Sequence, residues 1–258
     1  MIENQKLETH LISLSNTLME LLWPLRCVGC DKLGELLCEH CDDDLPRIDS
    51  QNRCKRCGAP YGCIVCTECS GTKGPLPLSY TMSVSPFEFC DAAARLTVIY
   101  KDQHEQRLAT LCALAILEVM PKDWIQWADL VCYIPADRRA IRKRGFCHMR
   151  LVAEEFSRLT GLMLTHVLQK ETVRDQRSLN RSERAENLAR AFRLADTSAR
   201  VMTNEKINGI KDTTDISGKN IILLDDVCTT TATLNIAGEV LLTAGAIEVR
   251  AATVCRVY

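Results

Sequence analysis

The sequence lacks the aromatic content, the net positive charge and the long apolar stretches that mark two large classes of protein. Phe, Trp and Tyr make up 5% of its 258 residues, and its formal net charge is −1. Proteins that bind single-stranded DNA combine a basic groove with stacking aromatic rings, so single-stranded DNA is a disfavoured partner. No apolar stretch is long enough to span a bilayer, and we expect no contact with a membrane.

Two catalytic motifs and a secretory signal are also missing. The chain carries neither a Walker phosphate-binding loop nor a Ser-His-Asp arrangement, which argues against the hydrolases that depend on them. Its first residues include Glu3, Lys6, Glu8 and Glu20 in place of a basic segment followed by an apolar run. We therefore expect a cytoplasmic protein, and in a reducing compartment clustered cysteines bind metal instead of forming disulfides.

Cysteine is the residue that the chain has in excess. Nine of its 15 cysteines fall between Cys27 and Cys69. Because a Cys-x2-Cys turn lets both thiolates face one ion, two such pairs supply the four sulfurs of a tetrahedral zinc site. Four sulfurs leave no open position, so we expect structural zinc and not catalytic zinc. The predicted ligands are Cys27, Cys30, Cys38, Cys41, Cys54, Cys57, Cys66 and Cys69.

The spacing leaves several details of these sites open. Cys63 also stands in Cys-x2-Cys spacing, and His40 adjoins a predicted ligand, although we expect this histidine to be solvated or capping. Neither the number of zinc ions nor the pairing of the ligands follows from the sequence. Gly29 and Gly58 lie where a knuckle turn often needs a positive φ. A segment with so few apolar residues needs metal binding for its stability.

Composition divides the chain into three parts. Residues 1–24 are expected to hold an N-terminal helix, because leucines recur at helical spacing over 5–23 and Pro24 follows as a stop. Residues 25–71 are the cysteine-rich block, which the paired motifs identify as a double zinc ribbon. Residues 72–258 have the composition of an ordinary α/β domain.

Apolar periodicity in this last part predicts alternating helices and strands. The last three of them, strand, helix and strand, form a βαβ unit, which implies a parallel sheet. The predicted fold class is therefore α/β, with an open, mainly parallel sheet, flanking helices and a small cysteine-rich zinc-ribbon module in front. The expected helices lie at 106–119, 138–160 and 230–246, and the expected strands at 128–135, 163–170, 220–226 and 247–254.

The stretch 221–234, IILLDDVCTTTATL, carries most of the chemistry. A buried strand runs into the carboxylates of Asp225 and Asp226, and ligands of open parallel sheets bind beyond the carboxyl ends of the strands. A threonine-rich loop and a helix N-terminus follow, which together make a phosphate cradle. The combination suits a ribose 5-phosphate. The alternative is an Asp N-cap, but capping requires only one Asp. The loop residues are Cys228, Thr229, Thr230, Thr231, Ala232 and Thr233.

A second cluster of charge is basic. Arg138 and Arg139 open a run of five cations after a predicted strand end. Cations at a helix N-terminus oppose the macrodipole, so a bound anion would relieve them, and the arginine fork matches phosphate oxygens. The alternative is the solvated start of a helix.

The stretch 221–234 resembles the phosphoribosyl pyrophosphate (PRPP) signature of type I phosphoribosyltransferases. That signature has apolar residues, two acids, two variable positions and a loop of Thr/Ser–Thr–Gly–x–Thr/Ser. Taken with the upstream cysteines, the chain resembles the ComF family, of the ComFC and GntX type, over roughly residues 20–258. Thr231 stands where the signature has glycine, and a β-branched residue tolerates positive φ poorly.

Two further segments carry the resemblance. The family's R-x-R-G-F-N-Q core is matched within 133–156, where Cys147 and His148 replace the Asn and Gln. A Q-x-x-L-x-x-x-x-R-x-x-N run is matched within 174–192, and Lys101 follows Tyr100 as in the family's tyrosine–lysine segment. For the arginine-rich stretch, a substrate-covering loop and an exposed salt-bridged helix are equally supported. The matching residues are Arg142, Arg144, Gly145, Phe146, Gln176, Leu179, Arg184, Asn187 and Phe192.

The resemblance implies a type I phosphoribosyltransferase fold and a transferase that displaces pyrophosphate from PRPP with the help of Mg²⁺. Asp225 and Asp226 would orient the ribose, the loop 228–233 would hold the 5′-phosphate, and Arg138 and Arg139 would contact pyrophosphate. Lys101 is assigned to the same site. The resemblance also implies a link to DNA uptake and to DNA-processing proteins. The competing hypothesis is a catalytically inactive nucleotide sensor whose zinc module is an adaptor for such partners.

Overall fold

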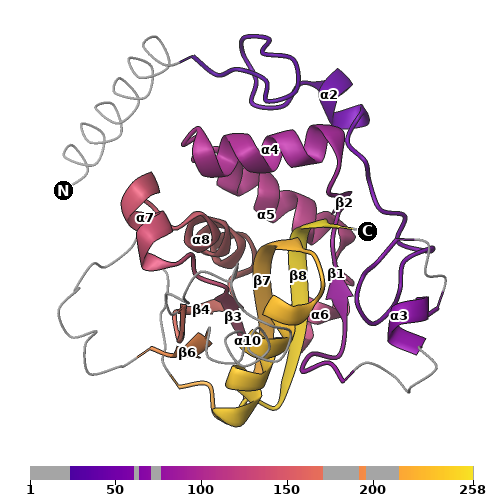
Figure 1. Cartoon of the computed structure of the whole chain (residues 1–258), viewed down its shortest axis with the longest axis vertical. Helices are drawn as coiled ribbons and strands as arrows, with labels where there is room; N and C mark the ends of the chain where they lie inside the picture. Colours follow the sequence, from indigo (N-terminus) through magenta and orange to yellow (C-terminus); the bar gives the residue numbers. More distant parts are fainter. Residues whose placement is uncertain (1–23, 61–63, 71–76, 171–191, 196–214, 258) are drawn as a thin grey trace, which may run out of the picture. The chain divides into compact units, whose positions relative to one another are not determined.

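The computed structural model describes residues 24–60, 64–70, 77–170, 192–195 and 215–257 (Figure 1). Internal contacts divide the chain into two units, Met1–Leu45 and Pro46–Tyr258. The first two cysteine pairs belong to the first unit and the last two to the second. The helix expected at 5–23 and the matched run at 174–191 lie outside the described residues, and the domain boundaries at 24/25 and 71/72 stay predictions.

The second unit is built on a parallel sheet of order β1-β8-β7-β3-β4, in which β2 also pairs with β8. All of its pairings are parallel, so the predicted open parallel sheet with flanking helices is confirmed. The strands are β1 (Ser83–Val84), β2 (Phe87–Glu88), β3 (Leu130–Tyr133), β4 (Met163–Thr165), β7 (Asn220–Cys228) and β8 (Glu248–Arg256).

The centre of this sheet is β7. Ile221, Ile222, Leu223 and Leu224 are fully buried, and because successive side chains point to opposite faces, both faces of the strand are apolar. Strands of parallel sheets have this pattern, since helices cover them on both sides. The run of four apolar residues therefore places this strand at the centre of the sheet.

Helices cover the two faces of the sheet (Figure 1). β3 connects to β4 through α7 (Arg138–Arg144) and α8 (His148–Thr160), whereas β7 connects to β8 in the opposite direction through α10 (Ala232–Thr243). Crossovers between parallel strands are right-handed as a rule, so connections in opposite directions place α8 and α10 on opposite faces. The helices α4 (Asp91–Asp102), α5 (Leu108–Val119) and α6 (Asp123–Trp127) precede β3, and α5 contacts α8 and β8.

Two sequence predictions are corrected by the structure. The helix expected at 138–160 is two helices, because Gly145 adopts the left-handed conformation at φ 80° and ends α7. The strand expected at 163–170 is also two elements. β4 belongs to the main sheet, whereas β5 (Leu168–Lys170) pairs antiparallel with β6 (Phe192–Leu194) in a separate ladder.

A close backbone approach fixes α10 against the segment before β1. A Cβ atom placed on Gly238 would lie 2.5 Å from the carbonyl oxygen of Ser79. The amide of Ser79 in turn donates to the side-chain oxygen of Asn235, at 2.5 Å. Gly238 is therefore present in a helix, where glycine is unfavourable, because no side chain fits between the two segments.

We expect Gly238→Ala to destabilise the second unit by about 1–3 kcal/mol, since the methyl group forces α10 away from a backbone oxygen. Urea denaturation followed by circular dichroism measures the change. Glu239→Ala, at the exposed neighbouring position of the same helix, is the control and is expected to stay within about 0.5 kcal/mol of the parent. Equal stabilities of the two variants would contradict the close approach.

Candidate functional site

A cavity of about 230 Å³ lies at the carboxyl ends of β3 and β7. The connections from these neighbouring strands run in opposite directions, to β4 and to β8, so the cavity marks the switch point where open α/β sheets bind ligands. Its lining is mostly charged or polar. The side chains of this kind are Lys101, Asp137, Arg144, His148, Lys170, Asp225, Asp226 and Thr233.

Asp226 is the most heavily engaged side chain in the cavity. Its Oδ2 lies 2.5 Å from the Nζ of Lys101 and within hydrogen-bond distance of the Nε2 of His148. Its Oδ1 accepts from the amide of Val227 at 2.6 Å. Burial raises the pKa of this carboxyl, but the bond to His148 and the charge of Lys101 outweigh burial and hold the pKa well below its usual range. Asp226 is therefore ionised and paired.

The partners of Asp226 come from two helices that are distant in sequence. Lys101 stands in the last turn of α4, and His148 is the first residue of α8. The hydroxyl of Tyr100 donates to the carbonyl oxygen of His148 at 2.6 Å, which joins the two helix ends. His148 is only 5% exposed, and its second ring nitrogen lies 3.3 Å from Arg144. The three elements α4, α8 and β7 thus converge on one carboxylate.

Asp225 has a different environment. It is 6% exposed, and its Oδ1 accepts from the amide of Asp226 at 2.9 Å. Burial, followed by the neighbouring charge of Asp226, raises the pKa of Asp225 to about 8. Two adjacent carboxyls in one dry site do not both ionise readily, so Asp225 is the protonated member of the pair at neutral pH and the one that a cation or a sugar hydroxyl would recruit.

The predicted phosphate loop follows directly. β7 extends to Cys228, two residues beyond the predicted end of the strand, and Thr229 and Thr230 form the exposed turn before α10. Thr231 is the N-cap of this helix at φ 62°, and no side chain caps the helix. The N–H groups of the first turn, at Ala232 and Thr233, are thus left for an anion, as in other helix N-termini that bind phosphate.

Thr231, which stands where the signature has glycine, has an unusual backbone conformation. The backbone there is left-handed, as the glycine of the signature allows, and a threonine adopts it although β-branched residues rarely do. The side chain is buried, at 6% exposure. The loop therefore keeps the shape that glycine favours, at a strain of order 1–2 kcal/mol.

Arg138 and Arg139 are exposed and lie outside the cavity lining. The side chain of Asp137 caps α7 by accepting from the amides of Arg139 and Ala140, both at 2.9 Å. The remaining cations of the run stand in the last turn of this short helix, where the macrodipole favours them. The electrostatic need for an anion is thus met within the chain, and a pyrophosphate contact of these two arginines stays a prediction.

Four charged or polar residues of the cavity lining were missed as site residues by the sequence analysis: Asp137, Arg144, His148 and Lys170. Arg144 and His148 belong to the matched R-x-R-G-F segment, which was the signal for them. Lys170 ends β5, and its position at the cavity depends on the chain leaving the main sheet after β4, which no local pattern indicated.

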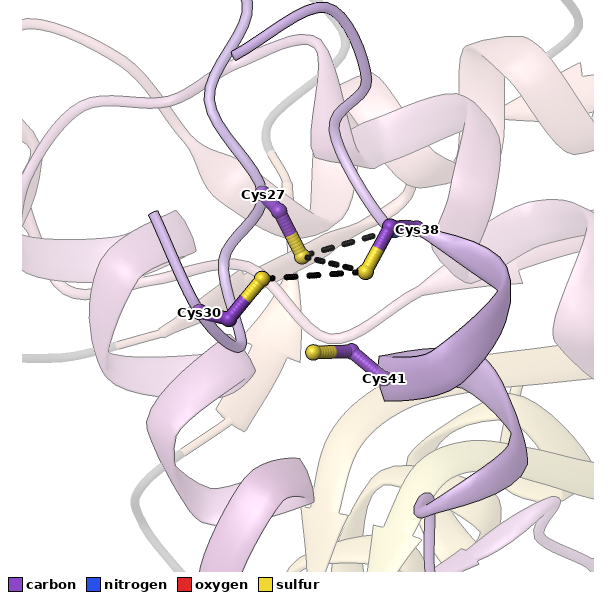
Figure 2. Close-up of side chains that lie close together, drawn as sticks. All are labelled: Cys27, Cys30, Cys38 and Cys41. Carbon is purple, nitrogen blue, oxygen red and sulfur yellow. Dashed lines mark hydrogen bonds between the residues drawn. The ribbon is translucent and has the colours of Figure 1, made fainter. Parts of the chain in front are cut away.

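The eight predicted zinc ligands form two groups of four. Within each group all sulfur atoms lie within 4.8 Å of one another. In the first group the sulfur of Cys38 lies 3.6 Å from that of Cys27 and 3.7 Å from that of Cys30, and the four side chains converge (Figure 2). The second group has the same spacing, with 3.6 Å between Cys57 and Cys66. The groups are Cys27, Cys30, Cys38, Cys41 and Cys54, Cys57, Cys66, Cys69.

These separations fit zinc. Sulfurs at 2.3 Å from a tetrahedral ion lie about 3.8 Å apart. Backbone amides also point at the sulfurs, with Cys38 N–H on Cys27 at 3.4 Å and Cys66 N–H on Cys54 at 3.2 Å. Burial raises the pKa of the Cys27 thiol, but these backbone bonds prevail and lower it to about 6. Both groups are therefore suited to structural zinc.

The structure also answers the details left open by the spacing. The pairing is sequential, with two neighbouring pairs in each group. His40 lies beside Asp44 with its side chain 82% exposed, as expected for a solvated residue. Gly58 has the expected positive φ, whereas Gly29 does not. Gly29 is needed for another reason, because a Cβ there would lie 2.4 Å from the sulfur of Cys41. Cys63 lies outside the described residues.

Residues 163–257 match the family model described as the phosphoribosyl transferase domain. The matched region runs from β4 to β8 and includes both carboxylates and the threonine loop. No match was found among the curated proteins. In the part of the chain that the structure describes, no helix has the length and apolarity needed to cross a membrane.

We expect substitution of the two acids by asparagine to have opposite effects on the stability of the protein. Because the pKa of Asp225 is about 8 in the native state and about 4 in the unfolded chain, the native state binds more protons across that window and loses stability as the pH rises. Asp225→Asn is therefore expected to be more stable than the parent at pH 8, by at least about 1 kcal/mol, and the difference should vanish near pH 4.

Asp226→Asn provides the matched comparison. It leaves Lys101 and His148 without their buried partner, so we expect it to destabilise the protein at neutral pH by about 3 kcal/mol. Thermal denaturation of the parent and both variants between pH 4 and pH 8 measures these effects. Destabilisation of the same size by both variants at pH 8 would contradict the assignment of proton and charge.

Proposed function

We propose that this protein is a PRPP-binding phosphoribosyltransferase of the ComF family, located in the cytoplasm. The observation that carries the proposal is the cavity at the β3–β7 switch point, where the acidic pair and the N-terminus of α10 meet. The family model, over residues 163–257, covers β7 and α10 but not β3. Carboxylates on one side and a phosphate cradle on the other suit a ribose 5-phosphate that lies across the strand ends.

Each part of the site has a role in this proposal. Asp225 accepts hydrogen bonds from the ribose hydroxyls, and Asp226, held by Lys101 and His148, supplies the fixed negative charge that stabilises a developing cation at the anomeric carbon. The backbone and hydroxyls of 228–233 bind the 5′-phosphate. Lys101, Arg144 and Lys170 give the cavity the positive charge that a pyrophosphate group requires.

The donor set of the cavity also suits a magnesium ion. Mg²⁺ binds in proteins through one or two carboxylates together with substrate phosphates, and Asp225 is the carboxyl of the pair that would be recruited. Bound with PRPP, the ion would neutralise charge on the departing pyrophosphate. The bond from the anomeric carbon to pyrophosphate breaks, and a bond from that carbon to the acceptor forms.

A catalytically inactive nucleotide sensor is the second candidate function. Two observations favour it: Asp226 is already saturated by partners of the chain itself, and Thr231 carries backbone strain at the phosphate loop. In this case the pocket would bind a ribose-phosphate nucleotide, and the zinc module would contact DNA-processing proteins. Such a role agrees with the link to competence that the ComF resemblance implies.

We expect PRPP with Mg²⁺ to bind the zinc-loaded protein with micromolar affinity in a calorimetric titration, a typical strength for an enzyme substrate. Asp225→Ala/Asp226→Ala should abolish the heat, because the ribose contact of Asp225 and the negative charge of Asp226 are both lost. Glu155→Ala, an acid on α8 outside the cavity, is the matched control and should bind as the parent does. Absence of heat from a folded, zinc-loaded parent would sink the proposal.

The same titration tests the arginines and separates the two functions. Arg138→Ala/Arg139→Ala should weaken PRPP about tenfold if these residues contact pyrophosphate, and should have no effect if they are the solvated start of α7. Release of pyrophosphate in the presence of candidate nucleobase acceptors identifies the transferase. Tight binding of nucleoside monophosphates without any such release identifies the sensor.

A further inference from the structure

A buried arginine at the end of β8 contacts the predicted phosphate loop. Arg256 is only 3% exposed. Its Nη1 donates to the carbonyl oxygens of Cys228, at 2.9 Å, and of Thr229, and also to that of Val257 at 2.6 Å. The first two oxygens belong to the turn that leads from β7 into the loop. One guanidinium nitrogen therefore holds the start of the loop against β8.

The same guanidinium reaches the second cysteine group. The Cys57 thiol, a member of that group, lies close enough to the guanidinium of Arg256 to interact with it electrostatically. The group is built directly on the sheet, since a Cβ on Gly58 would lie 2.8 Å from the carbonyl oxygen of Ser83 in β1. The loop and the second group are thus neighbours of one side chain within a single unit.

Two donors between the loop and the cysteine group lack partners. Among the described residues, the Nε of Arg256 and the hydroxyl of Tyr80 are buried and have no hydrogen-bond acceptor. Tyr80 is 3% exposed, and burial, followed by the neighbouring Cys228 and Cys57 thiols, raises its pKa. Buried donors without acceptors are costly, and negative charge on the neighbouring cysteines would offset part of that cost.

Metal-bound thiolates supply such negative charge. Four thiolates on one divalent ion carry two net negative charges, which are costly to bury without a cation and donors around them. Such outer partners orient the ligands and raise metal affinity. The first group differs in this respect, because the adjacent arginine, Arg26, pairs with Asp31 at 2.8 Å and has 52% of its side chain exposed.

We propose that Arg256 is a positioning residue that joins the second cysteine group to the phosphate loop. Its guanidinium stabilises the metal-bound thiolate of Cys57 and, from the same position, holds the carbonyl oxygens of Cys228 and Thr229. Metal at the second group, and not at the first, then sets the loop conformation. The inference rests on the proposed function only for the identity of the loop's ligand.

The first test measures metal release from the full-length protein loaded with zinc at both groups. Arg256→Met is expected to release one of the two ions to a chelator about 10–100-fold faster than the parent. Arg250→Met is the matched control, since this arginine lies on the same strand and stacks on Trp127 at 3.9 Å. Equal release rates in the two variants would overturn the contact with the cysteine group.

The second test measures hydrogen exchange at the amides of 229–233. Cys57→Ser and Arg256→Met should each raise exchange there about tenfold, because the loop loses its anchor. Cys27→Ser/Cys30→Ser, which disables the first group, should leave exchange unchanged. Unchanged exchange after loss of the second ion would overturn the coupling. If Arg256→Met does not fold, Arg256→Lys replaces it, because lysine keeps the buried charge without the guanidinium geometry. We expect partial effects of this variant in both tests.

PRPP binding distinguishes this inference from the proposed function. In a parent that binds PRPP, Arg256→Lys should raise the dissociation constant about tenfold, whereas Cys27→Ser/Cys30→Ser should not change it. A parent that does not bind PRPP overturns the proposed function, and metal release and hydrogen exchange then decide the role of Arg256 alone. Faster exchange with unchanged PRPP affinity would overturn the link between loop order and binding.

Discussion

The burial of the Asp226 carboxylate is the constraint on which the candidate site depends. An ionised carboxyl removed from water is stable only when it is paired and hydrogen-bonded. Lys101 and His148 meet this need, and they bring the end of α4 and the start of α8 to the end of β7. The pairing of this one charge therefore positions the elements that line the cavity. The geometry of the cavity exists before any ligand is bound.

This pairing also gives the two acids different protonation states. Asp226 is held ionised by partners of the chain, and burial together with this neighbouring charge keeps the proton on Asp225 in the empty site until a cation arrives. The loop after β7 adopts the left-handed backbone conformation at Thr231 although this residue is not glycine. Arg256 supports the start of the loop, since it donates to the carbonyl oxygens of Cys228 and Thr229, three and two residues before Thr231. The residues proposed to bind the ligand are thus held in place by side chains of neighbouring elements.

Much of the fold was predictable from the sequence, because its strongest signals are local. Four apolar residues before Asp225 mark a central parallel strand, and Cys-x2-Cys spacing marks the metal groups without reference to the rest of the chain. The resemblance supplied Lys101. The break at Gly145 was missed because the apolar pattern continues across it. The meeting of His148 with Asp226 was beyond local reasoning, since 78 residues separate them, and nothing in the sequence around Arg256 indicates a contact with Cys57.

A crystal structure of the zinc-loaded protein with PRPP and Mg²⁺ tests the central claim most directly. The account predicts that the ribose hydroxyls lie on Asp225, that the 5′-phosphate lies on the amides of 229–233, and that Asp226 keeps Lys101 and His148. Electron density for the 5′-phosphate elsewhere, such as beside Arg138 and Arg139, would contradict it. So would separation of Asp226 from both of its partners on binding, because the site would then not be preformed.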